Sequence, residues 1–189
     1  MHKISSERKK RVTDAGVGRR SFVKEAAAGL LAASAGQAQA PPRRAAIHTR
    51  LTELFELVYP IVLAPMGGAA GGELAAAVSN AGGLGLVGGG FGNPASLAKE
   101  LEAVKSKTTR KWGVGLITWR ASEDALHVAL KYKPDVFWLS FGDPLKFSKP
   151  IKSAGCVLIC QVQDVASAVA AKKAGADLIV AQGTEAGGR

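Results

Sequence analysis

The chain has 189 residues, of which 47% are hydrophobic, and this is enough to bury one core. Its net charge is +10 at pH 7, but residues 1–50 hold eleven of the 25 Lys and Arg residues and three of the 15 Asp and Glu residues, a net charge of +8. Residues 51–189 hold a net charge of only +2, which argues against a basic face for nucleic acid.

The first 45 residues have the layout of a signal peptide, with a basic start, a mildly apolar Ala-rich stretch over 26–35 and then small residues. The pair Arg19 and Arg20, followed by Phe22, resembles a twin-arginine signal. We therefore predict an exported, periplasmic protein with no stable membrane span. A cytoplasmic protein with a disordered basic tail is the alternative.

Helix starts are marked by residues whose side chains cap backbone amides. They precede helices expected over about 50–55, with Leu51, Leu54 and Phe55 on one face, and over about 94–107, 123–133 and 165–174. The four capping residues are Thr49, Asn93, Ser122 and Asp164. A further helix of small residues is expected over 72–80, and a short helix before residue 156.

Six short apolar runs alternate with these helices at intervals of about 22–28 residues, which is typical of parallel βα units. We expect strands over 61–64, 84–87, 113–118, 136–139, 156–162 and 177–181. A complete (β/α)8 barrel needs about 200–250 residues. Residues 46–189 therefore predict a TIM-type (β/α)8 barrel of which about the first six units are present. A doubly wound sheet is disfavoured because no G-x-G-x-x-G motif opens the first helix.

Cys156 and Cys160 are the only cysteines, and both fall on the fifth apolar run. If this run is extended they lie about 13 Å apart, which is beyond the roughly 7 Å that a disulfide spans. They are predicted to be buried, reduced thiols, and their spacing is not that of metal ligands.

The loop after the sixth run is rich in glycine. It begins with Gln182 and Gly183 and continues to Gly187, Gly188 and Arg189. Ligands of parallel α/β proteins bind beyond the carboxyl ends of the strands. Glycines let backbone amides approach a ligand closely, and Gln182 offers both a donor and an acceptor. By itself this pattern fits a ligand-binding loop and an ordinary Gly-rich turn equally well.

Three motifs, in order, resemble the nitronate monooxygenase family, also called 2-nitropropane dioxygenase. They are PIVLAPMGG over 60–68, NAGGLG over 80–85 and QGTEAGG over 182–188. The resemblance implies a TIM-type barrel that binds FMN and oxidises alkyl nitronates with molecular oxygen. A small-molecule nitronate and oxygen are then the expected partners, and a homo-oligomer is possible.

The resemblance also implies roles for individual residues. Ala64, Pro65 and Met66 would line the face of the flavin, although filling of the core is an equal alternative for Met66. Gly115 would stand where many members have an Asn against the flavin. Gln182 and Gly187 would contact the flavin ring and its phosphoryl end, with Gly183 and Gly188 in the same loop.

The sequence departs from the family at Arg189, where the family has a His. An arginine cannot act as a base near neutral pH, but it can bind an anion bidentately, so Arg189 is a candidate substrate-binding residue. The catalytic base stays unassigned, and His127 is expected on a helix surface. The seventh and eighth units are also missing, so the 189 residues alone are expected to hold FMN weakly.

Two further readings of function remain open. One is an enoyl-reductase-like flavoenzyme on the same barrel, which would use a nicotinamide as reductant. The other is a truncated, non-catalytic remnant. The tryptophans flank the expected strands and are expected in the core or at its rim; they are Trp112, Trp119 and Trp138.

Overall fold

The structure is a computed structural model that describes residues 47–89 and 93–185. The expected leader and the loop end at Gly187, Gly188 and Arg189 lie outside the described residues. None of the helices in the described ranges is long and apolar enough to cross a membrane.

The described residues form one parallel sheet of five strands, in the order β1-β2-β3-β4-β5. Each strand pairs with the next strand along the chain. This sequential order is that of consecutive units of a (β/α) barrel, because the order of a doubly wound sheet reverses part-way. The expected partial barrel is confirmed. The strands are β1 (Gly85–Gly88), β2 (Trp112–Ile117), β3 (Val136–Ser140), β4 (Val157–Val162) and β5 (Leu178–Ala181).

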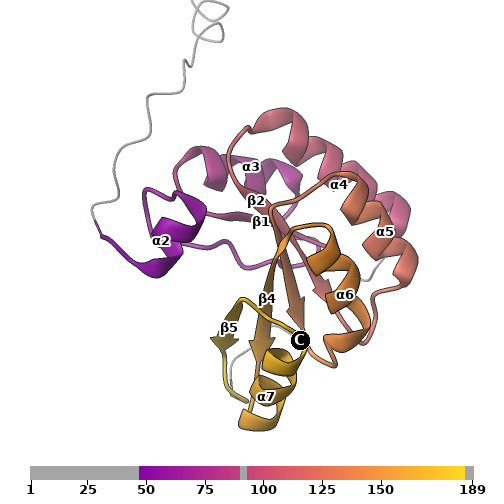
Figure 1. Cartoon of the computed structure of the whole chain (residues 1–189). Coiled ribbons are helices and arrows are strands. Elements are labelled where there is room, and N and C mark those ends of the chain that lie inside the picture. Colours follow the sequence, from indigo (N-terminus) through magenta and orange to yellow (C-terminus); the bar gives the residue numbers. More distant parts are fainter. Residues whose placement is uncertain (1–46, 90–92, 186–189) are drawn as a thin grey trace, which may run out of the picture. The chain divides into compact units, whose positions relative to one another are not determined.

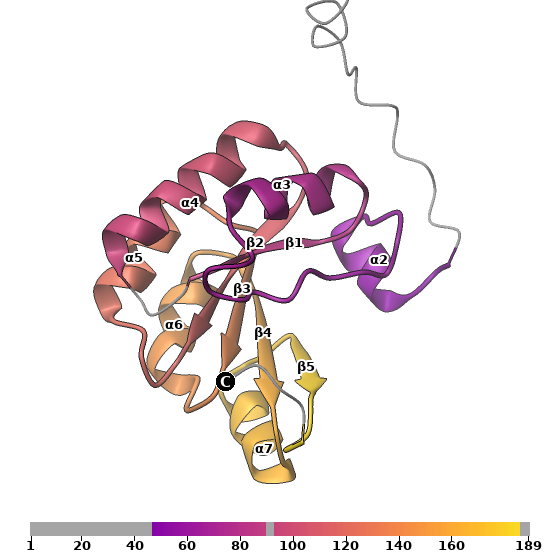
Figure 2. The ribbon, with the colours of Figure 1, turned by 180° about the vertical axis from the view of Figure 1, so that it is seen from behind.

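Helices α3 to α7 lie along one side of the sheet and α2 lies on the other, as the two opposite views show (Figures 1 and 2). Four side chains each accept a hydrogen bond from a backbone amide at the start of a helix, as predicted. They belong to Thr49, Asn93, Ser122 and Asp164. The helices are α2 (Arg50–Phe55), α3 (Gly72–Asn80), α4 (Pro94–Lys107), α5 (Glu123–Lys131), α6 (Leu145–Ser153) and α7 (Val165–Lys173).

The strand expected over 61–64 is not formed as such. Only an isolated parallel bridge joins Val62 to Leu84, the residue directly before β1. Pro60 and Pro65 flank the segment, and a proline has no amide hydrogen to give to a ladder. The segment therefore lies beside β1 in the expected direction but does not extend the sheet by a full strand.

Side chains of the strands alternate between two cores. The side covered by α3 to α7 holds the larger cluster, which includes Phe137 and Leu158 from the strands. The opposite side, which is the inner face of the barrel, holds Trp138 and Ile159 together with Phe55 from α2. Leu54 was expected beside Phe55 but is 44% exposed, so α2 buries a narrower face than predicted.

Candidate functional site at the carboxyl ends of the strands

The loop that contains Ala64, Pro65 and Met66 lies against glycines at the carboxyl ends of β1 and β2. A Cβ atom added to Gly115 would overlap Cβ and Cγ of Pro65. A Cβ atom added to Gly88 would meet the backbone of Met66 at 2.5 Å. The missing side chains of Gly88 and Gly115 thus make room for the loop.

Of the residues predicted to line a flavin, Pro65 therefore packs directly on Gly115 in the structure. Ala64 is exposed and Met66 is 50% exposed. This exposure shows that Met66 does not fill the core, which was one of its two predicted roles. The loop presents accessible apolar surface at the edge where α/β proteins bind ligands.

The inner face continues from Gly115 to Trp138, because these two residues are register partners in β2 and β3. Trp138 is buried, and its indole Nε1–H donates to Ser140 Oγ at 3.0 Å and to Gln161 Oε1 at 3.2 Å. Gln161 lies on β4 beside Ser140 in the register. The hydrogen-bonded side chains of Trp138, Ser140 and Gln161 therefore form a polar cluster next to the apolar inner cluster, toward the carboxyl ends of the strands.

Gln182 joins this network directly after β5. Gln161 Nε2 donates to Gln182 Oε1, and Gln163 Nε2 donates to the same oxygen at 3.3 Å. The backbone amide of Gln182 donates to the carbonyl of Val162 at 2.9 Å, which extends the pairing of β4 and β5 by one bond. The predicted site residue Gln182 is thus held by both its backbone and its side chain.

Gly183 follows with φ +83°, in the left-handed region that glycine tolerates best. Nothing lies within 4 Å of a Cβ atom added there, so the backbone conformation, not space, favours glycine. Gly187, Gly188 and Arg189 are outside the described residues, so their predicted roles stay predictions.

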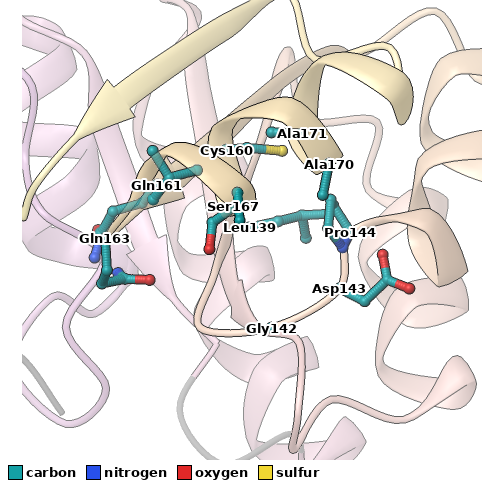
Figure 3. Close-up of a pocket in the computed structure, with 12 residues that line it drawn as sticks. Leu139, Gly142, Asp143, Pro144, Cys160, Gln161, Gln163, Ser167, Ala170 and Ala171 are labelled. Carbon is teal, nitrogen blue, oxygen red and sulfur yellow. The ribbon is translucent and has the colours of Figure 1, made fainter.

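A cavity of about 260 Å³ lies on the other side of β4, between this strand, α7 and the loop from β3 to α6. In the view of Figure 3, Gln161 and Gln163 lie together at one end of the cavity, and Asp143 and Pro144 at the other. The cavity therefore adjoins the glutamine network but belongs to the helix-covered side of the sheet.

Cys160 lines this cavity and is a free, buried thiol, as is Cys156. Burial raises the pKa of Cys160 to about 11, and the negative charge of Asp177 adds to this effect. Burial also raises the pKa of Cys156, with a smaller contribution from Asp135. Both residues are neutral thiols near pH 7 and therefore poor nucleophiles, and their burial agrees with the prediction of buried, reduced thiols.

The histidines of the described ranges do not approach the glutamine network. His127 is exposed in the middle of α5, as predicted, and His48 precedes α2. Within residues 47–89 and 93–185, His, Cys, Asp and Glu side chains form no group of three or more that could hold a metal ion. Within the described residues, this edge offers side-chain amides, the hydroxyl of Ser140, apolar side chains and backbone groups.

Comparison with known proteins identifies relatives of this chain. The family model described as nitronate monooxygenase matches residues 48–127. The chain is related to the nitronate monooxygenases. A probable nitronate monooxygenase of Staphylococcus haemolyticus is 32% identical over an alignment that covers 75% of this chain and 50% of the relative. A probable nitronate monooxygenase of Staphylococcus aureus is 32% identical with similar coverage.

Solved structures agree with this relationship. FabK from Thermotoga maritima superimposes with a TM-score of 0.66 at 35% identity, over 71% of this chain and 44% of FabK. Nitroalkane oxidase from Streptomyces ansochromogenes superimposes with a TM-score of 0.65 at 29% identity, over 74% of this chain and 50% of the oxidase. The chain spans about half the length of the curated nitronate monooxygenases that it matches.

The sequence predicted site roles for the loop at 64–66, Gly115 and Gln182, which stay predictions, and it did not single out Ser140 or Gln161. Trp138 was expected only as a core or rim residue. Trp138 and Trp112 are buried and Trp119 is 66% exposed, so that expectation is confirmed, but the role of the Trp138 indole as a donor was not foreseen. A period of two along β4, with Gln161 on the same face as Ile159, is the signal that marks the glutamine as inward-facing.

Proposed function

We propose that the protein is an FMN-dependent oxidoreductase of the nitronate monooxygenase type, which oxidises alkyl nitronates with molecular oxygen. The observation that supports this proposal is the arrangement at the carboxyl ends of the strands. An exposed apolar loop packed on Gly115 lies on the same inner face as an amide network that ends at Gln182.

The residues present fit the ring system of a flavin. A flavin ring is planar and apolar on its faces, and its edge carries hydrogen-bonding atoms, so it needs a flat apolar surface beside a few fixed polar groups. Pro65 and Met66 supply the apolar surface, and Gln182 supplies a fixed polar group. When bound, FMN would take electrons from the nitronate and pass them to oxygen.

A nitronate substrate also suits the absence of a histidine from this edge within the described residues. A neutral nitroalkane must lose a proton before it is oxidised, which calls for a general base. A nitronate is already an anion and needs no such base. Arg189, which replaces the family histidine, would bind this anion through its guanidinium group.

An enoyl-reductase-like flavoenzyme is the second candidate. The enoyl reductase domain of MlnA shares the fold, with a TM-score of 0.54, but it is only 15% identical to this chain and supports the fold alone. This candidate differs in its reductant, because a nicotinamide would supply the electrons.

Three measurements on the purified protein test the proposal. Bound flavin is read from its visible absorbance, and chromatography of the released cofactor separates FMN from other flavins. Oxygen consumption with an alkyl nitronate is then compared with NAD(P)H consumption with an enoyl thioester. We expect the released cofactor to be FMN, held weakly by the 189 residues alone, and any oxygen uptake to depend on the nitronate. Oxidation of NAD(P)H by the thioester alone would favour the second candidate, and failure to bind any flavin would favour a non-catalytic remnant.

A further inference from the structure

We propose that the protein has a second ligand site, for a small organic anion, at the amino ends of the strands. The site is an open cavity of about 200 Å³. Gly83, Lys111 and Asp135 line it, and each lies one or two residues before β1, β2 or β3. The cavity is therefore at the opposite end of the sheet from the edge proposed to bind flavin, and the proposal does not depend on the function proposed above.

Part of the lining of this cavity is apolar. Phe55 and Leu57 line it, and both are buried members of the inner cluster. The cavity is larger than an engineered apolar cavity of about 150 Å³ that holds benzene. A single small ring therefore fits against the apolar side chains.

Arg110 supplies a positive charge to the cavity. It lines the cavity and is half-buried, so its side chain lies against the protein instead of extending into solvent. The ion pairs among the described residues do not include its guanidinium group. A guanidinium group carries five N–H donors in a planar fork that matches a carboxylate. We therefore assign Arg110 as the anchor of the anionic group.

The acidic residues of the lining oppose a bound anion only weakly. Asp135 is paired with Lys111, at 3.2 Å from Oδ1 to Nζ, and its Oδ2 accepts the backbone amide of Trp112 at 3.1 Å. Its charge is thus offset within the protein. Glu56 is the other acidic residue of the lining, and it is exposed, so salt in the solvent screens its charge.

The loop that carries Arg110 is fixed by side chains of α3. Ser79, which is buried, donates through Oγ to the carbonyl of Lys111 at 2.9 Å. Thr108 donates through Oγ1 to Asn80 Oδ1 at 2.7 Å, and the same Oγ1 accepts the backbone amide of Arg110 at 3.0 Å. The backbone on both sides of Arg110 is therefore held in place, which reduces the entropy that a ligand has to offset.

Basic side chains gather at this end of the sheet. The last turns of α4, α5, α6 and α7 all contain lysine, and each of these helices is followed within a few residues by a strand. Lys107 and Lys152 are paired with carboxylates. Helix dipoles favour lysine at these positions, so the lysines alone identify no ligand. Their positive potential adds to the attraction of an anion to the cavity.

Three probes, added to the 189-residue chain, separate the contributions of charge and apolar surface. Benzoate has a ring and a charge, inorganic phosphate has only charge, and benzyl alcohol has only the ring. ¹⁵N–¹H NMR follows the backbone amides of residues 82–83 and 109–111, which line the cavity. We expect benzoate to shift these amides, and the other two probes to bind roughly 3-fold more weakly or less. If either binds as tightly as benzoate, or if benzoate leaves these amides unshifted, the proposal is wrong.

Two substitutions test the anchor from opposite directions. Arg110→Gln removes the positive charge and should weaken benzoate binding roughly 3- to 10-fold. Glu56→Gln removes a screened negative charge and should tighten binding roughly 2-fold. Lys149→Gln is the matched control, because Lys149 is exposed on α6, lies outside the lining and loses the same charge as Arg110.

The control decides between a site and general attraction. Equal weakening by Arg110→Gln and Lys149→Gln would overturn the site, because any lost positive charge would then have the same effect. The amide spectrum also shows whether each variant is folded. If Arg110→Gln is not folded, the direction of the change in Glu56→Gln decides.

The outcome is separate from that of the proposed function. Benzoate binding at this cavity in a chain that takes up no FMN would support the second site and count against the flavin assignment. FMN binding without a benzoate response at residues 109–111 would leave the proposed function standing and overturn the second site.

Discussion

At the scale of single residues, the contact between Pro65 and Gly115 fixes which side chains position 115 can carry. The resemblance to the nitronate monooxygenases implied an Asn as the usual residue at position 115, and in this chain the ring of Pro65 takes the space above that backbone. Restoring the family residue is therefore not a neutral change. The loop and the glycine have to be considered as a pair.

We predict that Gly115→Asn destabilises the fold by about 1–3 kcal/mol, the usual cost of overpacking a filled site. The free energy of unfolding is measured by urea denaturation. Pro65→Ala removes the obstructing ring, so the double variant Pro65→Ala with Gly115→Asn should recover part of the loss. If the double variant loses as much free energy of unfolding as the two single variants added together, the two residues do not compete for the same space.

Cys160 gives a prediction with a defined pH range. Its pKa is raised from 9.0 to about 11, first by burial and then by the charge of Asp177, so the folded state favours the neutral thiol. The stability that this provides is complete below pH 9 and is lost as the pH rises toward 11. We expect the native chain to resist a thiol-specific disulfide reagent at pH 8, and to react at both cysteines once urea unfolds it. Rapid reaction of the native chain would contradict the buried, neutral state.

The residue-scale comparison also shows where sequence reasoning reaches its limit. Gln182 was predicted because it follows an apolar strand and opens a Gly-rich loop. Gln161 was not, because its neighbour in the network, Trp138, lies 23 residues earlier and the pairing depends on the register of β3 with β4. A single sequence shows the alternation along one strand but not which residues of two strands stand side by side.

At the scale of elements, α3 begins without a side-chain cap of its own. Its N-cap residue is Gly71, and the amide of Gly72 is instead bound by Glu100 of α4, with Oε2 at 2.7 Å. A carboxylate near a helix N-terminus also interacts favourably with the helix dipole. One side chain thus serves as the cap of a helix in the preceding βα unit.

We predict that Glu100→Ala destabilises the chain by about 1 kcal/mol, as the loss of an N-cap does. Glu102→Ala is the matched control, since Glu102 is exposed on the same helix. Both are measured by chemical denaturation. If the two variants have the same stability, the cap supplied by Glu100 is unimportant.

The first residue of a helix could be predicted from the sequence wherever a local capping interaction fixes it. The caps at Asn93, Ser122 and Asp164 lie within three residues of the amides they bind, and all three helices begin where expected. The segment over 61–64 was mispredicted as a full strand because its apolar run carries no sign of how many ladder bonds it makes. That number depends on β1, which lies more than twenty residues further on.

At the scale of the whole molecule, the net charge of +8 in the first 50 residues agrees with an export signal, which we propose although it lies outside the described residues. Changing both Arg19 and Arg20 to lysine should leave the protein in the cytoplasm at its full length. Fractionation and immunoblotting measure this. The same change at Arg43 and Arg44, the pair close to the expected end of the leader, is the control and should not alter export. Normal export of the first variant would contradict a twin-arginine signal.

The sequential order of the strands sets the contact order of the fold. Every pair of neighbouring strands begins within 27 residues, from Gly85 to Trp112 at the widest. The entropy of closing each loop is therefore nearly the same along the sheet, since it grows only slowly with loop length. Within the described sheet, each pair of neighbouring strands is therefore joined by a local connection, which favours fast folding. During synthesis β1 and β2 can pair while β5 is still on the ribosome, and each later unit adds to an edge that already exists.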